Sequence, residues 1–273
     1  MGPALTPAEA RVLPDPDGHV GPDALLAAAR LLLATGALRA EPRDEKRWWG
    51  TDRRLCLSVP DGRTPRAPHL LALRDALAEA AQKGPCLAPT EILHHLQKAF
   101  GVGYGGFLDA VRADLEERGL VHRTEHRTLG IRRRRWERTG PGESALAALE
   151  GRLAEARTIP ELLGHDPARA AAVAVGLGGL LLAFDELRPH YPELAEALRR
   201  HGEDRADTTW LSTLDAGGTA LGVASETGLI DGLTDTLTDG LSGALDALDA
   251  LGSAFDVGFD GGSADGGDGG GGD

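Results

Sequence analysis

The stretch that decides the fold is residues 89–138, PTEILHHLQKAFGVGYGGFLDAVRADLEERGLVHRTEHRTLGIRRRRWER. Apolar residues recur there at helical spacing in two stripes, which predicts two amphipathic helices. Four glycines between the stripes break the path, so the helices meet at a turn. Gly119 ends the second helix, and residues 120–139 predict a two-stranded hairpin. The stripes are Ile92, Leu93, Leu96 and Phe100, then Phe107, Leu108, Val111 and Leu115, and the glycines are Gly101, Gly103, Gly105 and Gly106.

Two helices followed by a two-stranded wing is the order of a winged helix. The N-terminal part repeats this order more weakly. Thr6 caps a short helix through Leu13, and a second helix runs from Pro22 to Gly36. Short strands at 37–41 and 55–59 then flank a polar loop. We therefore expect a mainly α protein with small β-hairpins, built from tandem winged-helix-like units.

Four segments follow from this pattern. They are a winged-helix-like unit 1 at 1–66, a linker helix plus winged-helix-like unit 2 at 67–157, C-terminal helices at 158–201, and an acidic, glycine-rich, largely disordered tail at 202–273. The uncharged run 170–184 predicts a buried core helix, because its fifteen residues fall short of the roughly 20 that span a bilayer. A membrane-contacting helix is the alternative.

The acidity of the chain belongs to the tail. Residues 202–273 carry fifteen acids against one base, a net charge of −14, whereas the whole chain has −13. Residues 1–201 therefore carry +1, so the folded part is neutral on average and its bases are clustered. Leucines at spacings of three and four in 229–251 favour an amphipathic helix, but glycines weaken it, so it would fold only on a partner surface.

The two cysteines, Cys56 and Cys86, lie far apart without metal-ligand spacing. This favours buried thiols in a reducing compartment, with a disulfide as the alternative. The N-terminus has no basic region followed by an apolar run, so it does not read as a signal peptide. We expect a cytoplasmic protein without a transmembrane segment, with a peripheral position at the membrane as the alternative.

Arginines are concentrated in the second hairpin. Between Arg118 and Arg138 there are eight arginines against two acids, a local net charge of +6. Guanidinium groups match phosphates, and a tryptophan beside them could stack on a base or lie at a lipid headgroup layer. A solvated strand, or one neutralised by the acidic tail, is the alternative. The candidate binding residues are Arg127, Arg132, Arg133, Arg134, Arg135, Trp136 and Arg138.

The first hairpin offers a weaker cluster of Trp48, Trp49, Arg53 and Arg54. Exposed adjacent tryptophans are uncommon on a surface without a partner. One of two adjacent strand residues normally faces the core, however, so the pattern favours packing of one ring.

A DNA-reading winged helix would place its second helix in the major groove. At the exposed positions of residues 104–118 we expect four acids against two arginines, which opposes contact with phosphates. Specific DNA binding is therefore disfavoured. The residues counted are Asp109, Asp114, Glu116 and Glu117 against Arg112 and Arg118.

The sequence contains no pattern that favours catalysis. The adjacent His94 and His95 point about 100° apart on a helix, so they do not form a metal pair. GVGYGG at 101–106 lacks the lysine and hydroxyl of a phosphate loop and is read as a turn. We expect no enzyme activity, no catalytic residues, no metal and no cofactor.

Two resemblances add to this picture. Part of the chain resembles the cytoplasmic part of an uncharacterised family of bacterial predicted membrane proteins, namely LTPAEARVL at 5–13, residues 23–41, VRADLEERGLVHR at 111–123, residues 172–198 and the glycine-rich terminus. Residues 24–41 and 115–136, with the helices after them, are also similar to the Golgi phosphoprotein 3 family. That family binds phosphoinositide headgroups through a tryptophan and arginines. The resemblance implies such a role for Trp48 or Trp49, with Arg53 and Arg54.

The sequence thus predicts a non-catalytic interaction module that contacts an unknown protein partner or an anionic surface through its arginine-rich hairpin. A phosphoinositide- or anionic-lipid-binding peripheral membrane protein is the first alternative, and a winged-helix nucleic-acid-binding regulator is the second. The acidic tail is a candidate intramolecular partner of the arginine hairpin.

Overall fold

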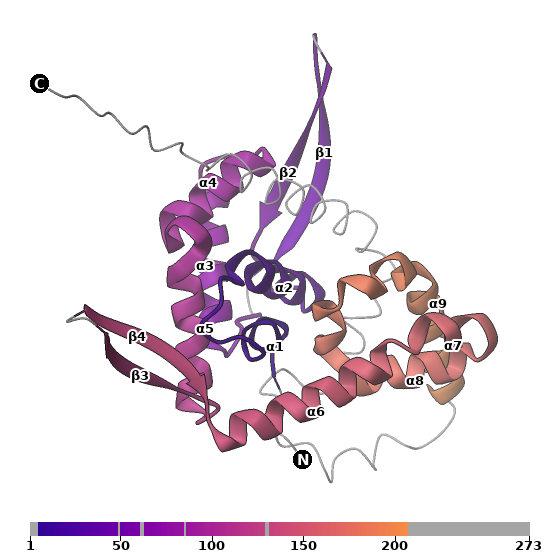
Figure 1. Cartoon of the computed structure of the whole chain (residues 1–273). Helices are drawn as coiled ribbons and strands as arrows, with labels where there is room; N and C mark the ends of the chain where they lie inside the picture. Colours follow the sequence, from indigo (N-terminus) through magenta and orange to yellow (C-terminus); the bar gives the residue numbers. More distant parts are fainter. Residues whose placement is uncertain (1–4, 49, 61–62, 85, 129–130, 207–273) are drawn as a thin grey trace, which may run out of the picture.

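The computed structural model describes residues 5–206 except 49, 61–62, 85 and 129–130. This part is mainly helical and carries two separate two-stranded antiparallel hairpins (Figure 1). The prediction of a mainly α protein with small hairpins is confirmed. The predictions for the acidic tail and for 229–251 lie outside the described residues.

The chain opens with two helices, α1 (Pro7–Val12) and α2 (Gly21–Ala34). Thr6 and Glu9 form a capping box at α1, in which each side chain accepts a hydrogen bond from the other residue's backbone amide. Helix α2 is almost wholly buried because alanine and leucine occupy nearly every position. It begins at a glycine for a steric reason: a Cβ on Gly21 would lie 2.2 Å from the carbonyl oxygen of Gly103.

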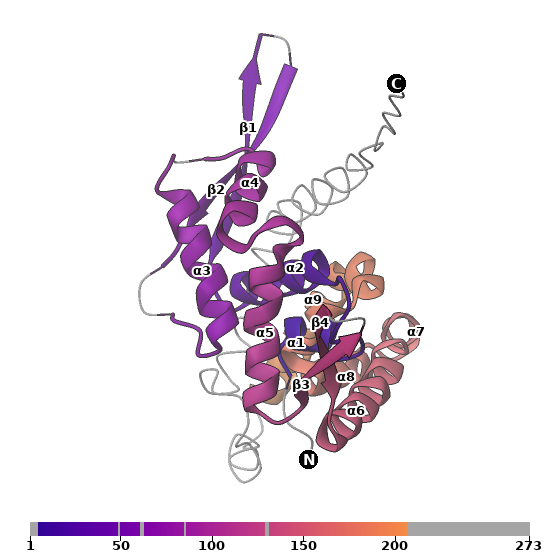
Figure 2. The same ribbon diagram turned by 60° about the vertical axis from the view of Figure 1, so that its left-hand side comes forward.

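The first hairpin is formed by β1 (Arg39–Arg47) and β2 (Gly50–Ser58). The prediction of short strands around a long polar loop is wrong here. The register pairs Asp44 with Arg53 and runs to Arg47 opposite Gly50, so most of the expected loop is strand. Asp44 and Arg53 carry opposite charges and stabilise the strand pair, whereas Arg43 opposite Arg54 and Glu45 opposite Asp52 are like-charged pairs. Leu55 and Leu57 are buried at its base, and the hairpin projects away from the body in both ribbon views (Figure 2).

Three helical segments follow, α3 (Pro68–Ala81), α4 (Pro89–Phe100) and α5 (Gly105–Glu117). The predicted stripe of α5 is buried, as are Ile92, Leu93 and Leu96 of α4, whereas Phe100 is half-buried. Gly101 and Gly103, with φ of 82° and 70°, make the turn between α4 and α5 together with the short 3-10 helix η1 (Val102–Tyr104). The interpretation as a turn is confirmed for 101–104, whereas Gly105 and Gly106 are the first residues of α5.

The second hairpin, β3 (Val121–Thr128) and β4 (Ile131–Arg138), leads directly into α6 (Gly140–Ala156). Thr139 caps α6 by accepting a hydrogen bond from the amide of Gly142. A side chain at Gly142 has no room, because its Cβ would lie 1.9 Å from the carbonyl oxygen of Leu120. The hairpin and α6 are therefore joined by a close backbone contact.

The described chain ends in α7 (Ile159–His165), α8 (Pro167–Leu177), two 3-10 helices, η2 (Gly178–Ala183) and η3 (Asp185–His190), and α9 (Tyr191–Ala206). The predicted core helix at 170–184 is shorter than expected because Gly178, at φ 54°, ends α8. Its apolar residues are nevertheless mostly buried.

Two hydrophobic clusters hold these elements. The larger joins buried residues from α1 to α6 and includes Leu180, Leu182 and Ala183 of η2. The smaller links the end of α6 to α7, α8, η3 and α9, with Tyr191 and Leu194 at 0% exposure. The first cluster thus places both hairpins on one continuous core.

The cysteines form a disulfide, Cys56–Cys86, which closes a sequence separation of 30 residues. The prediction of buried free thiols is wrong. It failed because the bond depends on a strand contact that spacing does not reveal: Leu55 and Leu87 exchange backbone hydrogen bonds of 2.8 and 2.9 Å beside it.

Candidate functional site

The arginine-rich hairpin β3–β4 is the first candidate site, and its register fixes which positions share a face. Opposite residues of an antiparallel pair lie on the same face, and neighbours alternate. Arg123 pairs with Trp136, and Arg127 pairs with Arg132. The positions Arg132, Arg134 and Trp136 therefore share one face, and Arg133 and Arg135 the other, as alternation predicts. The side chains of Arg127, Arg132, Arg133 and Arg134 lie outside the described part of the structure.

At the base of this hairpin, Arg138 is used for packing. Its Nε donates to Glu143 Oε1 at 2.7 Å, and its Nη1 donates to the backbone carbonyls of Leu13 (3.2 Å) and Pro14 (2.5 Å). These contacts tie the hairpin and α6 to the loop that follows α1. Arg138 therefore acts as a structural residue in this arrangement, which sequence reasoning had grouped with the binding arginines.

Trp136 is also partly committed to the body. Its ring is half-buried against the larger core cluster, and the Arg123 guanidinium lies 5.9 Å from the ring centroid, within cation–π range. Its backbone amide donates to Asp17 Oδ1 at 3.3 Å. The other Asp17 oxygen lies 3.5 Å from Arg135 Nε, whose side chain is 63% exposed. Of the described candidates, Arg135 is the one that presents its charge to solvent.

The tip of the first hairpin is the second candidate site. The register ends at Arg47 opposite Gly50, so Trp48 lies in the turn and is 91% exposed. Since the ring of Trp48 is exposed, the prediction that one of the two rings packs now concerns Trp49. Trp49 and the side chain of Arg53 lie outside the described residues.

Arg54 of the same hairpin is half-buried and binds within the protein. Its Nε lies 2.6 Å from Glu45 Oε2 on the facing strand, and its Nη1 donates to the Cys86 carbonyl at 3.4 Å. Both contacts hold the hairpin, so this arginine is not arranged as a free anion ligand. The two predicted clusters are not brought together either, because the hairpins leave the body in different places (Figures 1 and 2).

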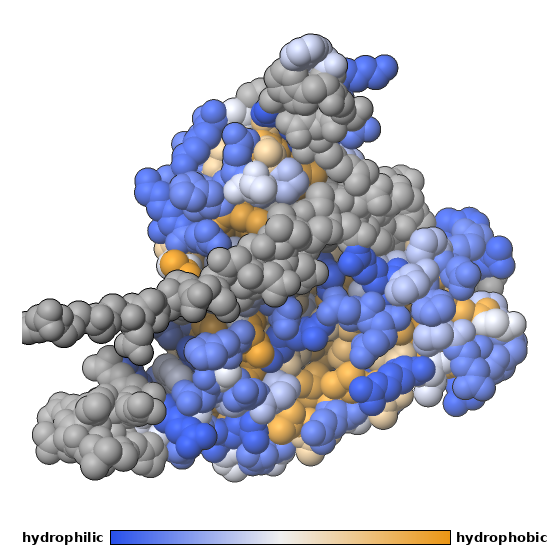
Figure 3. All heavy atoms as spheres, turned by 45° about the horizontal axis from the view of Figure 1, so that its top comes forward, coloured by the Kyte–Doolittle hydropathy of each residue, from blue (hydrophilic) through white to orange (hydrophobic). Residues whose placement is uncertain are grey.

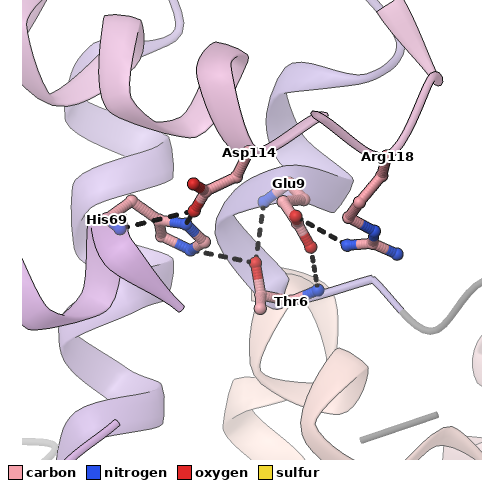
Figure 4. A network of polar contacts seen from close by, with 5 residues as sticks. All are labelled: Thr6, Glu9, His69, Asp114 and Arg118. Carbon is pink, nitrogen blue, oxygen red and sulfur yellow. Dashed lines mark hydrogen bonds and ion pairs between the residues drawn. The ribbon is translucent and has the colours of Figure 1, made fainter. Parts of the chain in front are cut away.

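A buried polar network that sequence reasoning did not find links α1, α3 and α5 (Figure 4). Asp114 contacts the Nδ1 of His69, whose side chain is 0% exposed, and also accepts the His69 backbone amide at 3.4 Å. His69 Nε2 lies 3.2 Å from Thr6 Oγ1. Arg118 Nη1 donates to Glu9 Oε1 at 2.7 Å, and Glu9 closes the network through the capping box. The capping pattern Thr6–Glu9 was the part visible in the sequence.

Thr6, His69 and Asp114 have the hydroxyl–imidazole–carboxylate order that some nucleophilic enzymes use. Here the threonine hydroxyl accepts the amide of Glu9, which makes it the cap of α1, and the imidazole is sealed in the core. These contacts are those of a clamp that joins three helices.

The network also corrects the expected surface of α5. The sequence predicts Asp114 among the exposed acids of this helix, but Asp114 is only 8% exposed. Its carboxylate can be buried because the ring and the backbone amide of His69 contact it. Arg112 is turned to the loop after α1, where Nε donates to the Pro16 carbonyl at 2.7 Å and Nη2 to the Gly18 carbonyl at 3.1 Å. The exposed ionised groups that α5 (Gly105–Glu117) retains are Asp109, Glu116 and Glu117.

A second polar cluster ties the C-terminal helices to the body. Asp185 receives Arg30 Nη1 at 2.5 Å and also contacts Arg11. Partial burial favours the neutral carboxyl, but the two guanidiniums outweigh it, so the pKa of Asp185 lies below its usual value. Beside it, burial raises the pKa of Tyr191 to about 12, and the hydroxyl donates to the Leu181 carbonyl at 3.1 Å.

The two adjacent histidines of α4 differ in burial. His94 is exposed, whereas His95 is 5% exposed and has its Nδ1 2.6 Å from Lys83 Nζ. In the described ranges, no group of three or more histidine, cysteine or acidic residues is placed to hold a metal ion.

Fold and site together define a mainly helical protein with two β-hairpins, one of them rich in arginine. No family model, curated protein or solved structure matches this chain. The two family resemblances therefore stay predictions. Among the helices that the structure describes, none has the length and apolar character needed to cross a membrane.

Proposed function

We propose that this protein is a non-catalytic interaction module that contacts an anionic partner surface through the β3–β4 hairpin. The observation that carries the proposal is the register, which sets Arg127 opposite Arg132. Like charges directly opposite each other destabilise a strand pair. An anionic partner would relieve that repulsion, which supports a binding role for the distal half of the hairpin.

The charges at the hairpin base point the same way. Arg138 and Arg135 meet Glu143 and Asp17, so the base is held by acids of the protein's own body. In residues 124–134, by contrast, the sequence has four arginines and one acid, Glu125. Positive charge is thus concentrated away from the anchoring contacts, where a phosphate or carboxylate surface could reach it.

The test is a charge reversal in the full chain, Arg132→Glu with Arg134→Glu. The matched control, Arg152→Glu with Arg157→Glu, makes the same charge change at two exposed positions at the end of α6. Binding to a polyglutamate peptide and to phosphatidylserine vesicles at about 50 mM salt would be measured for both. The proposal expects at least a tenfold loss for the hairpin variant alone, and equal losses in both variants would contradict it.

Anionic-lipid binding is the second candidate function, and the exposure of Trp48 favours it. A tryptophan ring suits the headgroup layer of a membrane, and Arg43 and Lys46 on the same hairpin are exposed. In flotation assays with vesicles containing anionic lipid, Trp48→Ala should then reduce recovery while leaving polyglutamate binding unchanged. Equal flotation of the variant and the parent chain would count against a lipid role for this tip.

We further infer that residues 67–157 form a winged-helix-like unit. Support comes from the order α3, the bridge at Leu87, α4, α5 and a hairpin. The acidic surface of α5 does not favour DNA as its ligand, because phosphate contacts supply most of the affinity for DNA. A random-sequence duplex at about 50 mM salt should give no mobility shift with the full chain, and a salt-sensitive shift would revive the nucleic-acid alternative.

A further inference from the structure

Beside the first hairpin, Leu87 forms an isolated antiparallel β-bridge with Leu55 of β2. Leu55 and Leu87 are linked by reciprocal backbone hydrogen bonds, and Cys56 and Cys86 stand directly opposite each other one position further along. Their Cα atoms are 4.0 Å apart, as expected for the closer, non-hydrogen-bonded position of an antiparallel pair. The disulfide therefore connects two neighbouring strands across their ladder.

This pairing attaches the hairpin to the segment that starts α4. Within the described residues it consists of the two Leu55–Leu87 hydrogen bonds, the disulfide, and the donation from Arg54 to the Cys86 carbonyl. Leu55 is fully buried and Leu87 nearly so, which places an apolar contact beneath the ladder. The covalent bond is the strongest of these few connections.

The disulfide is partly accessible to solvent. Cys56 and Cys86 are both half-buried, in contrast to the leucines beside them. They are also the two cysteines of the sequence, so no third thiol of this chain can divert the bond to another partner. An external dithiol can therefore reduce the pair, and reoxidation within one molecule returns the same bond.

We propose that Cys56–Cys86 is a reversible redox lock on the β1–β2 hairpin. A thiolate of an external dithiol attacks one cysteine sulfur, the S–S bond breaks, and the other cysteine leaves as a thiolate that takes up a proton. The second thiol of the reductant then attacks the mixed disulfide, closes its own disulfide and releases the remaining cysteine. Two electrons and two protons pass from the dithiol to Cys56 and Cys86.

Opening the lock leaves the Leu55–Leu87 hydrogen bonds, the donation from Arg54 to the Cys86 carbonyl and the packing of β2 against α3 and α4 to hold the hairpin base. The hairpin, with Trp48 exposed at its turn, then gains freedom relative to α3 and α4. The redox state would thus set how this tip is presented to a partner. The inference goes beyond the proposed function, because it concerns β1–β2 and is independent of the arginine-rich hairpin.

The test uses the full chain, purified without reductant and then compared with and without dithiothreitol by thiol titration and hydrogen exchange. We expect no free thiol before reduction and two after it. Amide exchange in 50–58 and 86–93 should accelerate at least tenfold on reduction, while α9 and β3–β4 stay unchanged. The variant Cys56→Ser with Cys86→Ser should show the fast pattern without dithiothreitol and no response to it.

Three results would overturn the proposal. Two free thiols in the untreated protein would mean that the bond is absent. If amide exchange in 50–58 and 86–93 stayed unchanged after confirmed reduction, the bond would not restrict the motion of the hairpin. Faster exchange throughout the chain, α9 included, would make the disulfide a general staple of the fold and not a lock on one hairpin.

Discussion

Replacing Asp114 with alanine tests whether the buried network of Figure 4 holds the helices together. Asp114 is 8% exposed and contacts both the ring and the backbone amide of His69, which has no solvent exposure. The substitution leaves two buried donors without a partner, each costing about 1–3 kcal/mol. We expect a loss of about 4 kcal/mol in the free energy of unfolding.

The measurement is urea unfolding at 25 °C, followed by far-UV circular dichroism. Asp109→Ala is the matched control, because Asp109 lies on the same helix but is 71% exposed and faces only Arg112, at 3.3 Å. Exposed pairs contribute about 0–1 kcal/mol, so this control should change stability little. Since small domains have about 5–15 kcal/mol in total, the two variants should separate clearly.

A double-mutant cycle with His69→Ala then isolates the pair. Residues in direct contact show coupling energies of about 0.5–3 kcal/mol, and we expect a value in the upper half of that range. If Asp114→Ala cost less than about 1 kcal/mol, or if its effect simply added to that of His69→Ala, the clamp would be refuted.

Three further outcomes follow from single contacts. In α6, Gly142→Ala should destabilise the protein by about 1–3 kcal/mol, because the new Cβ would lie 1.9 Å from a carbonyl oxygen. Gly151→Ala is the matched control: its Cβ would meet nothing within 4 Å, so this variant should stabilise the protein by about 0.5–1 kcal/mol. Thermal melts of both variants measure the difference. The pKa of Asp185 is lower in the folded than in the unfolded chain. Its ionised carboxylate therefore stabilises the fold at pH above the unfolded-state pKa, and this stabilisation is lost as the pH falls through the folded-state pKa. Asp185→Asn should make the free energy of unfolding depend less on pH on the acid side, and an unchanged pH dependence would contradict this. Removing the Cys56–Cys86 bond, which closes 30 residues, should lower the free energy of local opening of residues 56–86 by up to about 3.6 kcal/mol by the chain-entropy relation, to be checked by hydrogen exchange of this segment with and without reductant.

Much of the helical part could be read from the sequence because helices are governed by local spacing. The stripe Phe107, Leu108, Val111 and Leu115 was expected to face the core, and all four side chains are buried. The turn at 101–104 followed from its glycines, both of which adopt positive φ. In the last described helix, Leu194 and Leu198, which are four residues apart, are both buried. Each of these features depends on residues within one or two turns of each other.

The candidate site was predictable only as a cluster of charge. The sequence located the arginines of β4, and alternation predicted which positions share a face, as the register has it. It did not show that Arg138 reaches back to Leu13 and Pro14, or that Asp17 meets Arg135, because those partners lie more than a hundred residues away. Whether an arginine faces a ligand or anchors its own hairpin depends on such distant contacts.

Within the stretch 89–138, the sequence alone determined two helices, their turn and a basic hairpin, because hydrophobic periodicity and glycine act over a few residues. Tertiary structure decided that Asp114 is buried, since its partner His69 is 45 residues away. It also decided that Cys56 and Cys86 are bonded, since only the pairing of Leu55 with Leu87 brings them face to face. The role of a polar group or a thiol depends on which residue the fold places beside it, and local sequence patterns do not predict a partner that is distant in the sequence.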